Sequence, residues 1–130
     1  LKHAFSHINL SHLIKKKPFV IGETKTLKEA KEFMLKKNVT SLLVKRKLGF
    51  GLISSEDIVK QNANMGLPIS NYLTELPIIS ATSTSSELME KFYTTGLPFL
   101  PIVHNSKLLG VIEASSLEKL QKLHALERLK

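Results

Sequence analysis

The 130-residue chain repeats its own sequence pattern once. Residues 20–29 return as residues 78–87, and residues 51–55 return as residues 110–114. The offset is 58 positions at the first motif and 59 at the second, which predicts one residue inserted in the loop between the two motifs. A duplication of this kind normally builds two similar halves that bury each other's apolar faces, and ligand sites are kept or lost copy by copy. We therefore expect one compact unit, with function at the positions where the copies differ.

Each copy predicts the order strand, helix, strand, strand, helix. Thr26 and Glu29 have the spacing of a capping box at the start of a helix, and Thr84 and Glu87 repeat it. Apolar residues at helical spacing follow both pairs. They are Leu27, Ala30, Phe33 and Met34 in the first copy and Leu88, Met89, Phe92 and Tyr93 in the second, and Asn38 and Gly96 stand where a left-handed residue would end each helix.

Short strands are predicted at residues 39–44 and 97–103, and second strands pass through Ile53 and Ile112. Because Pro98 and Pro101 remove hydrogen-bond donors, we expect their strand to be irregular or at a sheet edge. The last helix of each copy is expected to begin near residues 54–55 in the first copy and 115–116 in the second. The predicted fold class is α/β (α+β), with two pseudo-symmetric β-α-β-β-α repeats packed together and an extra N-terminal helix. The expected domains are an N-terminal helical segment at 1–17, repeat 1 at 18–62, a linker with one helical turn at 63–76, and repeat 2 at 77–130.

The amino-acid composition excludes some classes of function. The chain contains no cysteine, which excludes disulfides and thiolate chemistry and suits a reducing compartment. We find neither a signal peptide nor an apolar run of membrane length, so we expect a cytoplasmic protein without a membrane partner. The first residue is leucine, and we expect a piece of a longer protein.

The positive charge is uneven along the sequence. Of the net charge of +8, all lies in residues 1–65, which hold thirteen basic and five acidic residues, whereas residues 66–130 hold six of each. The clusters are Lys15, Lys16 and Lys17, and residues 45–47. Two interpretations stay open: a solvated surface, or a face directed at phosphate, in RNA or in a neighbouring domain that holds RNA.

The duplicated pattern resembles the tandem cystathionine-β-synthase (CBS) domain pair, also called the Bateman module, over residues 18 to about 122. Gly51, Ser54 and Asp57 match its G-x-x-T/S-x-x-D motif. The resemblance implies a pocket for an adenosyl nucleotide such as AMP, ADP, ATP or S-adenosylmethionine. It implies that Asp57 holds the ribose hydroxyls and that Ser54 contacts phosphate.

The same resemblance implies that Val20 and Ile21 line the base and that Thr40 faces phosphate. Ser54 stands where a strand passes into a helix, so its hydroxyl and the following N–H groups could meet a phosphate at the positive end of the helix dipole. The alternative is structural, because Ser54 or Ser55 could simply cap the helix while Asp57 stabilises its first turn.

The second copy departs from the motif. Glu113 takes the position of Ser54, and Ser116 takes the position of Asp57. A carboxylate then points where phosphate would arrive, and the two like charges repel each other. We expect this second site to be degenerate.

Other constellations are weak. His3, His7 and His12 could bring two imidazoles to one helix face, but no carboxylate or thiolate accompanies them, so we expect surface histidines and no metal site. The sequence shows no Ser-His-acid set, so we expect no catalytic residues, no required cofactor and no enzyme activity.

The sequence therefore predicts a non-catalytic regulatory module that binds an adenosyl nucleotide and controls an attached catalytic domain of its parent chain. The alternative is a structural dimerisation or spacer module with vestigial pockets. The family resemblance implies a homodimer. Residues 56–73 are also similar to the inter-repeat segment of bacterial tRNA nucleotidyltransferase/poly(A) polymerase-type proteins, which implies tRNA as a partner.

Overall fold

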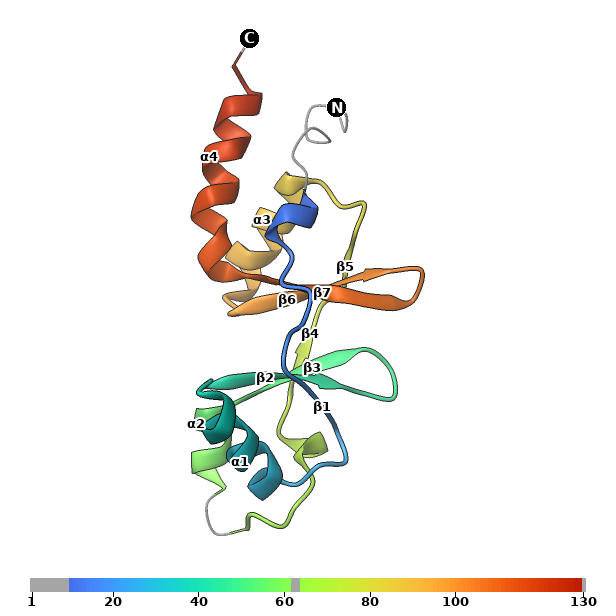
Figure 1. Ribbon diagram of the computed structural model, residues 1–130, viewed down its shortest axis with the longest axis vertical. Helices are drawn as coiled ribbons and strands as arrows, with labels where there is room; N and C mark the ends of the chain where they lie inside the picture. Colours follow the sequence, from blue (N-terminus) through green and yellow to red (C-terminus); the bar gives the residue numbers. More distant parts are fainter. Residues whose placement is uncertain (1–9, 62–63, 130) are drawn as a thin grey trace. The chain divides into compact units, whose positions relative to one another are not determined.

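The computed structural model describes residues 10–61 and 64–129, and Figure 1 shows their secondary structure. The chain divides into two units, each containing one copy of the repeat. One unit is Pro18–Leu76. The other joins residues Leu1–Lys17 to Pro77–Lys130, so the segment ahead of the first copy belongs with the second.

The first copy forms a mixed four-stranded sheet with two helices on one side of it (Figure 1). Its elements are β1 (Val20–Gly22), α1 (Leu27–Lys37), β2 (Ser41–Lys45), β3 (Phe50–Ser54), α2 (Ser55–Lys60), η3 (Ile69–Asn71) and β4 (Thr74–Leu76). The sheet order is β1-β2-β3-β4, with β1 parallel to β2 and the other pairs antiparallel. The buried core joins the inner face of α1 to the sheet through Leu27, Ala30, Leu42 and Ile53.

The second copy repeats this plan with three strands. Its elements are η2 (Leu10–Leu13), β5 (Ile79–Ser80), α3 (Ser85–Thr95), β6 (Phe99–His104), β7 (Lys107–Glu113), η4 (Ala114–Ser116) and α4 (Leu117–Glu127). The sheet order is β5-β6-β7, and the core contains Leu88, Phe92, Leu100, Ile112 and Leu120. The predicted fold class, mixed α and β in two similar repeats, is confirmed.

Both predicted capping boxes are present. The hydroxyl of Thr26 accepts from the N–H of Glu29 at 3.1 Å, and the hydroxyl of Thr84 accepts from that of Glu87 at 3.1 Å. The predicted helix ends are also correct, since Asn38 and Gly96 have φ of 57° and 64°. Both helices are therefore fixed by local sequence at each end.

The prediction that Tyr93 belongs to the apolar stripe of its helix is wrong. Tyr93 is 64% exposed, and its hydroxyl lies against the Nε2 atom of Gln121 on α4. The core side of α3 is supplied by Leu88 and Phe92, which are buried. A tyrosine can occupy a position of the apolar pattern without being buried, because its hydroxyl is stable in contact with water.

The N-terminal segment ends in a short extended stretch rather than a long helix. Residues 1–9 of the expected helical segment lie outside the described part of the chain. The described part forms the four-residue 3-10 helix η2, and Leu13 and Ile14 pack on the core of the second copy.

Lys15 then pairs with Val111 of β7, with two backbone hydrogen bonds of 2.7 and 3.1 Å. This places a piece of extended chain along the outer side of β7. In the first copy, β4 has the corresponding place beside β3. The predicted linker thus contains the expected helical turn, η3, and also the strand β4, which the sequence did not reveal because it is only three residues long.

The strand that contains Pro101 is irregular, as expected, but it is not at an edge. β6 lies between β5 and β7, and its register with β7 shifts between Ile102 and Val103. Pro101 is tolerated because β5 pairs with β6 only from Ile102 onwards, so no ladder bond on that side needs its missing N–H. The register shift skips Leu109, so the extra residue of the second copy forms a bulge within β7 rather than a longer loop.

The last helices begin differently in the two copies. α2 starts at Ser55, as predicted. In the second copy, one 3-10 turn, η4, comes first and α4 begins at Leu117, one residue after the predicted start. None of the helices in residues 10–61 and 64–129 has both the length and the apolar run that a membrane crossing requires.

Candidate functional site

Ser54 and Asp57 lie at the junction of β3 and α2, and they bind each other. The hydroxyl of Ser54 accepts from the N–H of Asp57 at 3.2 Å. The Oδ2 atom of Asp57 in turn accepts from the N–H of Ser54 at 3.0 Å and from its hydroxyl at 2.8 Å. The pair is therefore a third capping box, although its sequence signature uses aspartate in place of glutamate.

This arrangement affects how the junction could meet a phosphate. The N–H groups of Ser54 and Asp57 already have side-chain acceptors, and the N–H of Ser55 donates to the carbonyl of Thr40 at 2.8 Å. A phosphate here would therefore compete with internal bonds for these three N–H groups. The observed bonds agree with the structural alternative, in which Ser54 and Asp57 cap the helix. The nucleotide-binding role of these residues stays a prediction.

Thr40 lies beside this junction, whereas the predicted base-lining residues lie farther along the sheet. Thr40 precedes β2, whose first residue Ser41 pairs with Ser54. Val20 and Ile21 are on β1, where they pair with Leu43 and Val44 of β2. The structure thus brings Thr40, Ser54 and Asp57 together.

Val20 and Ile21 line a separate cavity of about 540 Å³ between β1 and α1. Phe33 and four charged side chains, two basic and two acidic, share this lining. They are Lys25, Glu29, Glu32 and Lys36, and Lys25 forms an exposed ion pair with Glu29 at 3.9 Å. Ser54 and Asp57 are not among the residues that line this cavity.

The second copy has the same backbone junction without its side chains. The N–H of Ala114 donates to the carbonyl of Pro98 at 2.8 Å, which repeats the bond from Ser55 to Thr40. Glu113 and Ser116 precede η4 and α4, and neither makes a side-chain capping bond. Pro98 is a difference that sequence reasoning missed, although the offset of 58 already aligned it with Thr40. The second junction therefore has a different side chain at each of these three positions.

The lysine cluster lies on the unit that contains the second copy. Lys15, Lys16 and Lys17 are all exposed, and the backbone of Lys15 is held by Val111. By composition, the unit with the second copy has ten basic and five acidic residues, and the other unit has nine and six. The charge that is concentrated in the first half of the sequence is thus shared between both units.

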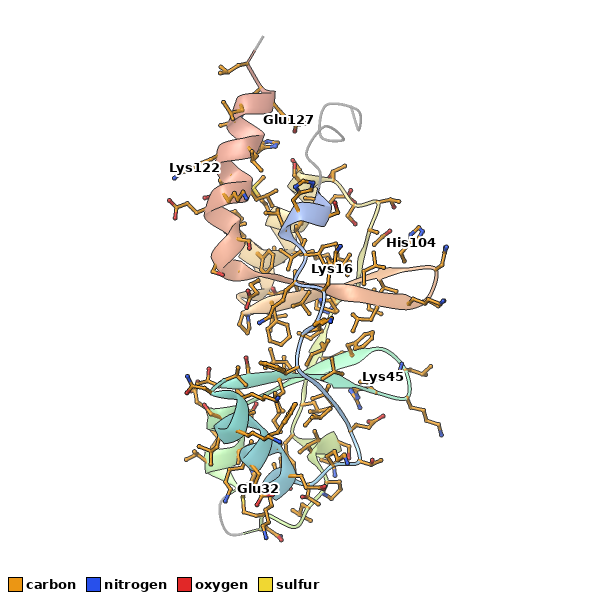
Figure 2. All side chains as sticks on the ribbon, viewed as in Figure 1. Lys16, Glu32, Lys45, His104, Lys122 and Glu127 are labelled. Atoms are coloured by element: carbon orange, nitrogen blue, oxygen red, sulfur yellow. The ribbon has the colours of Figure 1, made fainter. Side chains whose placement is uncertain are left out.

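The second basic cluster is partly neutralised. Glu23, which follows β1, accepts from the Nε of Arg46 at 3.4 Å and from the N–H of Lys47. This carboxylate fixes the loop between β2 and β3. Lys45, labelled in Figure 2, is the last residue of β2 before that loop, and its Nζ atom lies 5.8 Å from the ring centre of Phe50.

The histidines give no metal centre in the part of the chain that can be described. His3 and His7 lie outside the described residues, and His12 is exposed on η2. Within residues 10–61 and 64–129, no three histidine or carboxylate side chains gather as metal ligands would.

Comparison with known proteins identifies the architecture. Residues 10–64 match the sequence model of the CBS domain family. The CBS domain pair of protein MJ0100, solved with 5′-methylthioadenosine and S-adenosyl-L-methionine, superposes with a TM-score of 0.70 at 18% identity, covering 88% of this chain and 96% of that one. The chain has the fold of a CBS domain pair.

Two further structures of similar fold contain adenine ligands. CbpB in complex with c-di-AMP has a TM-score of 0.71 at 18% identity and covers 96% of this chain and 91% of its own. CBSX2 in complex with AMP has a TM-score of 0.71 at 16% identity and covers 88% and 96%. No curated protein matches the chain in sequence. At these identities the likeness establishes the fold, and the CBS-pair architecture predicted from the duplication is supported over nearly the whole chain.

Proposed function

We propose that this chain is a non-catalytic, cytoplasmic regulatory module that binds one adenosyl nucleotide at its first copy and controls an attached catalytic domain. The observation that carries the proposal is the difference between two equivalent junctions. The first has Thr40, Ser54 and Asp57 side by side, and the second has Pro98, Glu113 and Ser116. The adenine ligands in structures of the same fold support this ligand class.

The proposed contacts follow from the capping box. Both bonds from Ser54 end on the Oδ2 atom of Asp57, so we assign the Oδ1 atom to the ribose hydroxyls. The phosphate would accept from the hydroxyl of Thr40, and it would replace Asp57 as the acceptor of the Ser54 hydroxyl. A nucleotide that binds one arrangement of the module better than another shifts an attached domain by that difference in binding free energy and no more.

The decisive experiment is a thermal-shift series with AMP, ADP, ATP and S-adenosylmethionine. A ligand at 100 times its Kd adds about 2.7 kcal/mol to the free energy of unfolding, which is readily visible as a higher Tm. Asp57→Ala should remove most of the ligand-induced shift. Thr84→Ala is the control, because it removes a capping box in the second copy and lowers Tm without touching the proposed contacts.

Stoichiometry tests the same proposal independently. Calorimetry should give one site per chain, because Glu113 places a negative charge where a second phosphate would lie. The double variant Glu113→Thr, Ser116→Asp supplies the missing groups and should create a second binding event. An unchanged stoichiometry in a folded double variant would show that Pro98 or packing closes the site, and that charge does not.

The second candidate is a structural dimerisation or spacer module. The replacement of Thr40, Ser54 and Asp57 by Pro98, Glu113 and Ser116 at the second junction favours it, because a site without function is free to lose its ligand contacts. A flat thermal-shift series together with a dimer mass in light scattering would select this function over nucleotide sensing.

A third proposal concerns tRNA, with the module placed in a tRNA nucleotidyltransferase/poly(A) polymerase-type protein. The exposure of Lys15, Lys16 and Lys17 at the edge of β7 supports it. Binding of labelled tRNA should weaken steeply with salt, because each neutralised phosphate releases about 0.9 counterion. Replacing the three lysines by glutamine should flatten that dependence, and a variant that keeps the full salt slope would exclude this surface.

A further inference from the structure

The hydroxyl of Ser54 has a single proton to donate, and Asp57 receives it in this structure. The Ser54 Oγ atom lies 2.8 Å from the Oδ2 atom of Asp57, and the Ser54 N–H donates to the same oxygen at 3.0 Å. A serine hydroxyl donates one hydrogen bond, although it can accept two. It therefore cannot donate to Asp57 and to a phosphate at the same time. Its acceptance of the Asp57 N–H, at 3.2 Å, is compatible with either partner.

The two oxygens of the Asp57 carboxylate are unequally occupied. Oδ2 accepts two hydrogen bonds from Ser54, which uses both of its lone pairs. Among the residues that the structure describes, none donates to Oδ1. The pair is partly buried, so water competes less for these bonds than it does at an exposed capping box. A ligand that reaches Asp57 thus finds one open oxygen as long as the Ser54 hydroxyl stays bound to the other.

A ribose presents two neighbouring hydroxyl donors to such a carboxylate. The two groups match best when each hydroxyl has a carboxylate oxygen of its own. With the Ser54 hydroxyl bound to Oδ2, Oδ1 has to serve both ribose hydroxyls. Once a phosphate accepts the Ser54 proton instead, a lone pair of Oδ2 becomes available to the second ribose hydroxyl. Recognition of the phosphate therefore strengthens recognition of the ribose.

We propose that the hydrogen bond between Ser54 and Asp57 makes this site selective for 5′-phosphorylated ribonucleotides over adenosyl ligands without a phosphate. The inference rests on the proposed function, because it requires phosphate and ribose to meet at these two residues. A phosphorylated ligand exchanges one charged acceptor of the Ser54 hydroxyl for another. A nucleoside offers only a neutral 5′-hydroxyl, which is a weaker acceptor, so Oδ2 stays occupied. The site then ranks AMP above adenosine and S-adenosylmethionine.

A matched pair on α1 shows what the test has to separate. The Thr26 hydroxyl lies 3.2 Å from the Oε1 atom of Glu29, and the Thr26 N–H donates to the same oxygen at 3.0 Å. The Glu29 N–H returns a bond to the hydroxyl at 3.1 Å. These are the three bonds of Ser54 and Asp57, made at an exposed helix start. The bonds at Ser54 therefore also serve the start of α2, and capping has to be distinguished from ligand selection.

The test replaces Ser54 by glycine and follows AMP and adenosine by NMR titration of the intact chain to millimolar concentrations. Glycine is accepted at the first position of a helix, so α2 keeps its start. Because Ser54→Gly releases Oδ2, adenosine should bind about fivefold more tightly than it binds the original chain, the usual effect of one hydrogen bond. AMP should bind about fivefold more weakly, because its phosphate loses a donor. A purely structural role of Ser54 would weaken both ligands.

Two further variants control for capping. Ser54→Thr keeps the hydroxyl and should keep the preference for AMP. Thr26→Gly removes the matched pair on α1 and should change neither affinity. Weaker binding of both ligands to Ser54→Gly, or unchanged binding of adenosine, overturns the selectivity while nucleotide binding stands. An original chain that does not bind AMP overturns the proposed function and this inference together.

The 2′-hydroxyl of the ligand gives an independent test. In calorimetry, its removal should weaken AMP at least about fivefold more than it weakens adenosine, because only the nucleotide opens an Asp57 oxygen for each hydroxyl. This excess should disappear in Ser54→Gly. Repulsion between the phosphate and Asp57 cannot imitate the result, since it weakens AMP and its 2′-deoxy form alike. An equal effect of the 2′-hydroxyl on nucleotide and nucleoside in the original chain would refute the exchange.

Discussion

At the scale of single residues, the carboxylates of the capping boxes link local structure to pH. The pKa of Glu29 is held below its usual value of about 4.5, chiefly because the backbone N–H of Thr26 donates to its carboxylate at 3.0 Å. The hydroxyl of Thr26 adds a second bond, and Lys25 contributes a favourable charge. A lowered folded pKa stabilises the fold above the pKa of the unfolded chain, and the stabilisation is lost as the pH falls through the folded value.

We predict that Glu29→Gln removes part of the acid sensitivity of the fold. Urea unfolding between pH 6 and pH 3 should show the difference in free energy of unfolding between the original chain and Glu29→Gln shrinking as the pH falls, because protonation abolishes the advantage of the charged acceptor. Glu32→Gln on the same helix is the control. A difference that stays constant with pH would contradict this account of the capping box.

Gly110 is the residue whose small size the fold requires most clearly. Its φ is 151°, and a Cβ atom there would collide with the carbonyl oxygen of Lys15. We predict that Gly110→Ala lowers the free energy of unfolding by more than about 1 kcal/mol, because backbone strain and the lost pairing of Lys15 with Val111 act together. Gly66→Ala should be nearly neutral, since nothing lies within 4 Å of a Cβ built there. Equal effects in denaturant titrations would refute the close-approach argument.

At the scale of elements, the hairpin between β6 and β7 is locally strained. Asn105 and Ser106 form its turn with φ of 49° and 64°, and the second of these positions favours glycine. Ser106→Gly should raise the free energy of unfolding by about 0.5–1 kcal/mol, because a left-handed residue with a Cβ costs about 1–2 kcal/mol and glycine loses more entropy on folding. Thermal melts of Ser106→Gly and Ser106→Ala would check this, and a gain with alanine instead would argue against the turn geometry.

At the scale of the whole molecule, the N-terminal segment contributes to the unit that contains the distant second copy. Leu10, Leu13 and Ile14 pack on the core of the second copy, and Lys15 extends its sheet. We predict that a chain reduced to residues 18–130 loses hydrogen-exchange protection in β7 and α4 while β2 and β3 keep theirs. Uniform loss across both units, or no loss in β7, would show that the segment is not an integral part of the second copy.

Local sequence determined much of this protein by itself. The capping boxes at Thr26 and Thr84, the left-handed ends at Asn38 and Gly96, and the order of elements in each repeat follow from residues within four positions of one another. Such signals act within one helical turn, so they can be read without knowing the fold. The duplication added the architecture of each half, because two copies of one pattern predict the same order of elements twice. The expectation of one compact unit was wrong, since the chain divides into two units with separate cores.

Tertiary structure alone decided which unit each connecting segment joins. Whether Lys15 pairs with Val111 or β4 with β3 depends on backbone hydrogen bonds between residues far apart in sequence, and short extended stretches carry almost no periodic signal. The same long-range pairing shared the basic charge between the two units. A side chain's neighbours across a sheet are set by register, which local sequence does not specify when the strand is three residues long or shorter.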